Sequence, residues 1–176
     1  NLVEKNQFDT IYHEHYSYLS FLVVSAIFES NGLTIFDVEE LPTHGGSLRV
    51  YAQQSNFGQH KKNQSVESLQ QKEIKLGMNG IDFYQNFQLK VEKVKTDFLS
   101  FLVDAKTQGK SVVGYGAAAK GNTLLNFAGV QSDMLYYVVD RNPAKQNKFM
   151  PGSIIPIVGE EILMQEQPDF IVIFPW

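Results

Sequence analysis

A glycine-rich turn between an apolar strand and an apolar helix constrains the fold of this chain most strongly. Residues 111–115 are apolar enough for a buried strand and run into the turn GYGAAAKG at 114–121, after which apolar residues recur at helical spacing through 124–127. Continuous apolar segments at 135–139 and 169–174 predict two further strands. Fully apolar strands that alternate with helices form parallel sheets with right-handed crossovers, so we expect such a sheet here.

The residues before this turn predict smaller elements. Apolar residues at helical spacing follow Ser17, the expected N-cap, and end at Gly32, which suits the residue after a helix. The alternating segments 33–41 and 47–53 flank a glycine-containing turn and predict an antiparallel hairpin. Two helices should follow, at 66–76 and at about 81–107, the second with one long apolar stripe.

Together these patterns predict an α/β protein, in which a Rossmann-like parallel sheet domain is preceded by a helical and β-hairpin segment and a long helix. Residues 1–108 would be a junction segment that holds the His-Glu-His motif at 13–15, the hairpin and the long helix. Residues 109–176 would form a Rossmann-like nucleotide-binding lobe that makes one compact unit with it. Pro156 should limit 154–158 to an edge or loop role. The chain has no initiator Met or signal peptide and stops directly after a strand, so we expect a fragment cut at both ends.

Composition excludes several classes of function. The 176 residues carry a net charge of −4, which argues against binding to nucleic acid or to an anionic membrane surface. No apolar run is long enough to span a bilayer. The absence of cysteine excludes disulfides and thiolate metal sites and fits a cytoplasmic protein.

The run Tyr12-His13-Glu14-His15-Tyr16 gathers the groups needed to remove a proton beside a carbonyl. Histidine titrates near working pH, a carboxylate can orient it, and a phenol can donate to a developing oxyanion. The alternative is a turn before a helix that carries surface histidines, and residue types alone slightly favour it. Two histidines in an extended run do not make a zinc site, so we predict no metal.

The glycine turn is the second candidate site. Gly114 and Gly116 lie where backbone N–H groups at a helix N-terminus bind phosphate, and Lys120 follows. Asp140 comes 24 positions after Gly116, at the end of the next strand, where an acid accepts from a ribose hydroxyl. The alternative is that these glycines only allow a helix and a sheet to pack closely. Arg49, on the polar face of 47–53, could hold a phosphate or simply be solvated.

Four separate motifs resemble the C-terminal region of sugar C-methyltransferases. They are FDTIYHEHYSY at 8–18, HGGSLR at 44–49, GYGAAAKGN at 114–122 and DRNP at 140–143, and their order and spacing agree along nearly the whole chain. That family uses S-adenosylmethionine to methylate keto-sugars carried by a nucleoside diphosphate, in deoxysugar biosynthesis. It has an N-terminal zinc domain, a methyl-donor domain and a Rossmann-like C-terminal domain, and only the last, with the junction before it, resembles this chain.

The resemblance implies a role for each residue. His15 would be the general base, Glu14 would orient it or hold a sugar hydroxyl, and Tyr12 would stabilise the enolate oxygen. S-adenosylmethionine would bind only in the full-length protein, and zinc only in the N-terminal domain that this chain lacks. The nucleoside-diphosphate sugar would be held by residues of the hairpin and of the glycine-turn crevice, namely Arg49, Gly114, Gly116, Lys120, Asn122 and Asp140.

Two other functions fit the same residues. A Rossmann domain of an oxidoreductase would bind NAD(H) at the glycine turn. A non-catalytic nucleotide-binding module would bind a nucleotide but make no use of His15.

Overall fold

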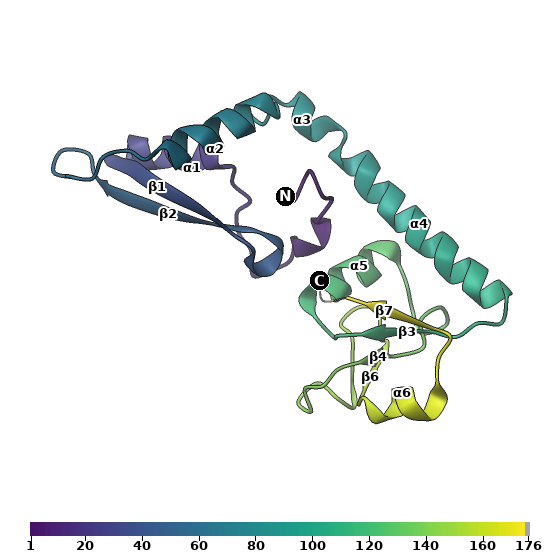
Figure 1. Ribbon diagram of the computed structural model, residues 1–176. Helices are drawn as coiled ribbons and strands as arrows, with labels where there is room; N and C mark the ends of the chain where they lie inside the picture. Colours follow the sequence, from purple (N-terminus) through teal and green to yellow (C-terminus); the bar gives the residue numbers. More distant parts are fainter. Residues whose placement is uncertain (175–176) are drawn as a thin grey trace. The chain divides into compact units, whose positions relative to one another are not determined.

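The computed structural model describes residues 1–174, and the chain divides into two units (Figure 1). The first unit contains Asn1 and Tyr16–Phe87. The second contains Leu2–His15 and the described residues from Gln88 onward. The second unit therefore includes both the sheet and residues 13–15, the His-Glu-His run. The division into domains at 108/109 stays a prediction.

The first unit is built on the predicted hairpin, which the structure confirms. Strands β1 (Leu33–Leu41) and β2 (Ser47–Gln54) pair antiparallel, and the 3-10 turn η2 (Thr43–Gly45) joins them. Helices α1 (Phe21–Ser30) and α2 (Gln64–Lys75) pack on this hairpin, and α3 (Asp82–Gln85) follows. The buried apolar residues that form the core of this unit are Phe21, Ile35, Val38, Val66 and Leu69.

The N-cap of helix α1 lies three residues after the predicted cap, Ser17. Ser20 is the N-cap, and its hydroxyl accepts from the Val23 N–H at 3.2 Å. The first two N–H groups of the helix donate to the buried carboxylate of Glu73 on α2, from Phe21 at 2.9 Å and from Leu22 at 2.8 Å. A residue 52 positions away thus completes the cap, and the sequence near Ser17 carries no sign of it.

The second unit holds the predicted α/β sheet, whose strand order over the described residues is β5-β6-β4-β3-β7. Strands β3, β4, β6 and β7 run parallel, and β5 pairs antiparallel with β6. In chain order the parallel strands lie 3-2-1-4 across the sheet, as in a Rossmann half. The bounds are β3 (Val112–Tyr115), β4 (Val138–Val139), β5 (Lys148–Phe149), β6 (Pro156–Val158) and β7 (Phe170–Ile173).

The edge position predicted for Pro156 is wrong, because β6 lies between β5 and β4. Pro156 is the first residue of the strand, where proline is tolerated. The hydrogen bonds to β5 run through the neighbouring carbonyls, with Met150 N–H donating to Ile155 and Asn147 N–H donating to Ile157. The missing N–H of Pro156 therefore removes no bond between β6 and β5.

Helices cover both faces of the sheet. Side chains of α4 (Phe87–Thr107) and α5 (Ala119–Ala128) share a core with one face, and α6 (Glu161–Glu166) packs on the other (Figure 1). The predicted helix 81–107 is interrupted at Asn86, where the backbone leaves helical geometry between α3 and α4. The strand predicted at 135–139 is regular only at its end, although Leu135 is fully buried.

The carboxylate of Asp169 joins the starts of β3 and β7, and its contacts should make the stability of the fold depend on pH. Asp169 accepts from the Lys110 ammonium and the Ser111 N–H, both at 2.8 Å, and these contacts lower its pKa to about 2. Since the folded pKa is below the model-peptide value of 3.8, the charged form stabilises the fold above about pH 4. That stabilisation is lost as the pH falls from about 4 to about 2.

Asp169→Asn should therefore lower the thermal unfolding midpoint at pH 7. The difference from the unsubstituted protein should shrink between pH 4 and pH 2, the interval set by the two pKa values. Unfolding followed by circular dichroism across this pH range measures both. An equal difference at pH 7 and pH 2 would show that the charge of Asp169 does not matter.

Candidate functional site

A cavity of about 370 Å³ in the second unit brings together parts of both predicted sites. This volume lies within the range of small-molecule pockets. Its walls come from the His-Glu-His run, from the turn and first residues of α5, and from the segment 144–157. The lining residues are Tyr12, His13, Ala117, Ala118, Ala119, Asn122, Thr123, Ala144, Lys145, Lys148, Phe149, Met150, Pro151 and Ile157.

The His-Glu-His run is held on this unit by the short helix η1 (Phe8–Thr10). Phe8 is buried, and its ring centroid lies 5.2 Å from that of Phe127 on α5. The ammonium of Lys95, on α4, lies over the same Phe127 ring. Phe8 thus anchors the residues that follow it against α5, so Tyr12 and His13 reach the cavity.

The ring of His15 is oriented by a backbone carbonyl. Its Nδ1 lies 2.7 Å from the Thr10 carbonyl oxygen, which can only accept, so Nδ1 carries the proton in this contact. In the neutral ring the lone pair is then on Nε2, the atom that a general base would use. The His15 ring lies 4.4 Å from the Tyr12 ring, between centroids. Tyr12 lines the cavity, whereas His15 and Glu14 are exposed and do not.

The glycines of the turn are used in packing. Gly116 has φ +90° and donates its N–H to the Val139 carbonyl at 2.7 Å, so it makes the turn itself. A Cβ at Gly114 would lie 2.5 Å from a ring carbon of Phe174, and one at Gly121 would lie 2.6 Å from Phe174 Cγ. Gly114, Gly116 and Gly121 are all buried. Close packing therefore accounts for Gly114 and Gly121 and the turn accounts for Gly116, and contact of any of them with a ligand stays a prediction.

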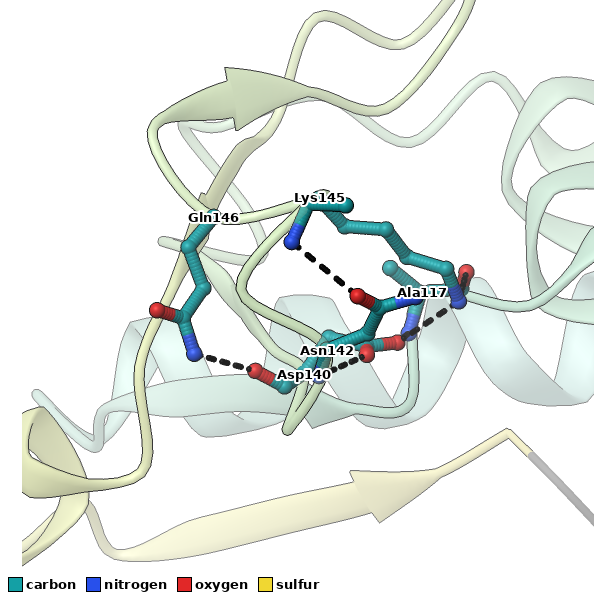
Figure 2. A network of polar contacts seen from close by, with 6 residues as sticks. Ala117, Asp140, Asn142, Lys145 and Gln146 are labelled. Carbon is teal, nitrogen blue, oxygen red and sulfur yellow. Dashed lines mark hydrogen bonds and ion pairs between the residues drawn. The ribbon is translucent and has the colours of Figure 1, made fainter.

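Asp140 ties the turn to the loop after β4, as Figure 2 shows. Its Oδ2 accepts from the Ala117 N–H at 2.8 Å and from the Lys145 ammonium at 3.0 Å, and its Oδ1 accepts from the Asn142 N–H at 2.8 Å. Burial raises the pKa of this carboxyl, but the hydrogen bonds it accepts outweigh burial and leave the pKa below its ordinary value. The predicted ribose contact stays a prediction, because these contacts are all to protein.

Lys145 lines the cavity, and reasoning from the sequence missed it. Its ammonium donates to the Ala117 carbonyl at 2.8 Å as well as to Asp140. The only signal in the sequence is a basic residue five positions after Asp140, the acid that follows β4. Of the residues predicted to bind substrate, Asn122 also lines the cavity, and its buried Oδ1 has no hydrogen-bond partner among the described residues.

The other predicted substrate residues lie elsewhere. Lys120 is half-buried in the first turn of α5 and is not part of the lining. Arg49 belongs to the first unit, where its Nη1 lies 3.2 Å from Glu39 Oε2 across the hairpin. Within residues 1–174, no group of three or more His, Asp or Glu could hold a metal ion. None of the helices in this part of the chain has the length and apolarity that crossing a membrane requires.

Comparisons of the chain with known proteins place it in one family. Residues 42–176 match the family model described as the C-methyltransferase C-terminal domain. The chain is also similar to the C-methyltransferase NovU of Streptomyces niveus, with 34% identity over 175 residues. That alignment covers 99% of this chain, including the His-Glu-His run, but only 41% of the relative.

Proposed function

Because the chain belongs to the family of C-methyltransferase C-terminal domains, we propose that it forms the substrate-binding part of a C-methyltransferase. The substrate in this proposal is a nucleoside-diphosphate keto-sugar, the methyl donor is S-adenosylmethionine, and the setting is cytoplasmic deoxysugar biosynthesis. The observation that carries the proposal is the cavity in which Tyr12 and His13 face the turn that opens α5 and two lysines.

The chemistry of carbon methylation supports a base beside this cavity. A carbon next to a ketone becomes a nucleophile when it loses a proton, and a well-placed imidazole can take that proton. His15 has the required lone pair on Nε2, since Nδ1 donates to Thr10. In the proposal His15 removes the proton, Tyr12 stabilises the enolate oxygen, and Glu14 holds a sugar hydroxyl. The ketone then lies at the Tyr12 end of the cavity.

The methyl donor does not fit the residues of this chain. S-adenosylmethionine would supply a methyl group on a positively charged sulfur, and a carboxylate commonly holds the ribose of such a nucleotide. The carboxylate in the expected position, Asp140, already accepts from Ala117, Asn142 and Lys145. We propose that other parts of the whole protein bind the donor. The same applies to the zinc implied by the resemblance.

A dinucleotide site is the second candidate, because the parallel strands follow the Rossmann order. Calorimetric titration of the full-length protein separates the two functions. We expect thymidine diphosphate to bind and NADH to show no binding under the same conditions, because the acid that would hold an NADH ribose is engaged. Thymidine alone controls for binding through the base. Tighter binding of NADH than of thymidine diphosphate would support the oxidoreductase, and binding of neither would exclude both nucleotide functions.

A further inference from the structure

The lining of the cavity favours an anionic ligand. Lys145 and Lys148 both line it, and the lining residues include no Asp or Glu, although acids outnumber bases in the chain as a whole. Asp140 is not part of the lining, and its side chain is only 12% exposed and accepts a hydrogen bond from the Lys145 ammonium. An anion entering this cavity would therefore meet ammonium and amide groups before it met a carboxylate.

Lys145 is held in place for such a contact. An ammonium has three N–H donors, and two of them are used, one by the Ala117 carbonyl and one by Asp140 Oδ2. Figure 2 shows the Lys145 side chain extended across the loop to Ala117. The third donor has no partner among residues 1–174, and the side chain remains 41% exposed. The ammonium is therefore held by two contacts, and it belongs to a side chain that remains partly exposed.

From this geometry we infer that Lys145 binds the diphosphate of the substrate and that Asp140 is the positioning residue that holds its ammonium. The identity of the ligand rests on the proposed function above. Asp140 neutralises the charge of Lys145 before the ligand arrives. The positive charge that attracts the ligand is therefore supplied by Lys148, which also lines the cavity. This assignment differs from the one made from the sequence, in which Asp140 and Lys120 both contact the ligand directly.

Substitution of Lys145 tests the inference in the full-length protein. Lys145→Gln should weaken the binding of thymidine diphosphate and of pyrophosphate by about 10- to 100-fold, since a charge-assisted hydrogen bond is lost. Lys110→Gln is the matched control, because Lys110 also pairs with an aspartate in this unit but does not line the cavity. It should leave both affinities within about twofold. Equal affinities for Lys145→Gln and the unsubstituted protein would overturn the inference.

A second measurement needs no substitution and so does not depend on the variant folding. Saturating pyrophosphate or thymidine diphosphate should protect Lys145 from reductive methylation, as read by mass spectrometry, while Lys93, whose side chain is 74% exposed, reacts as before. Unchanged labelling of Lys145 while thymidine diphosphate is bound would overturn the inference and leave the proposed function standing. Protection by pyrophosphate without any binding of thymidine diphosphate would support the contact between Lys145 and a diphosphate and would overturn the proposed function.

Discussion

His15→Ala in the full-length protein is expected to slow the exchange of the substrate's α-proton with solvent by about 10²- to 10⁴-fold. The ring is oriented through Nδ1 by Thr10, so Nε2 is the atom that would take the proton. Deuterium incorporation into the keto-sugar nucleotide, followed by mass spectrometry in D₂O without a methyl donor, isolates this step from methyl transfer. The affinity for the nucleotide sugar should stay close to normal, because in the proposal Lys145 and not His15 contacts the diphosphate.

His13→Ala is the matched control for this result. His13 is two positions away and lines the cavity, whereas His15 does not. We expect His13→Ala to reduce the exchange rate much less, because no hydrogen bond from residues 1–174 fixes the tautomer of its ring. If His13→Ala abolished exchange and His15→Ala did not, the base would be His13. Normal exchange in both variants would favour the non-catalytic nucleotide-binding module.

Elements with a strong local pattern could be predicted from the sequence. The hairpin strand β1 has the predicted bounds, because alternating apolar residues and a glycine-containing turn define it without help from distant residues. The strand–turn–helix unit around Gly116 was predicted for the same reason. The parallel direction of β3, β4 and β7 was predicted because these strands are fully apolar and are separated by helices.

Features made by side chains that meet across the fold could not be predicted. The cap of α1 depends on Glu73, and the break at Asn86 lies within an apolar stripe that continues on both sides of it. At the candidate site, the pattern correctly indicated that Asp140 follows β4, but not that Ala117 and Lys145 would occupy its carboxylate. The glycine spacing was likewise compatible with phosphate binding, and only the position of Phe174 explains Gly114 and Gly121.

That packing leads to the largest expected effect on stability. Gly114→Ala would place a Cβ 2.5 Å from Phe174 Cε2 and 3.0 Å from Val138 Cγ2. The Phe174 ring is buried, and its inner end lies against Gly121, so the ring has little room to move away. We expect Gly114→Ala to lower the free energy of unfolding by about 1–3 kcal/mol, as overpacking a core does. Phe174→Ala alone should cost about 3–5 kcal/mol.

A double-mutant cycle measured by urea unfolding tests whether the two effects share one cause. In the Phe174→Ala background the ring is absent, so adding Gly114→Ala should cost little more, and the coupling should be about 1–3 kcal/mol. Gly80→Ala is the control, because the nearest atom to its added Cβ would lie at an ordinary 3.7 Å. Additive losses would show that Phe174 is not what excludes a side chain at Gly114. If instead Gly114 contacts the nucleotide, Gly114→Ala would weaken thymidine diphosphate binding even in the folded double variant, whereas a packing role leaves that affinity unchanged.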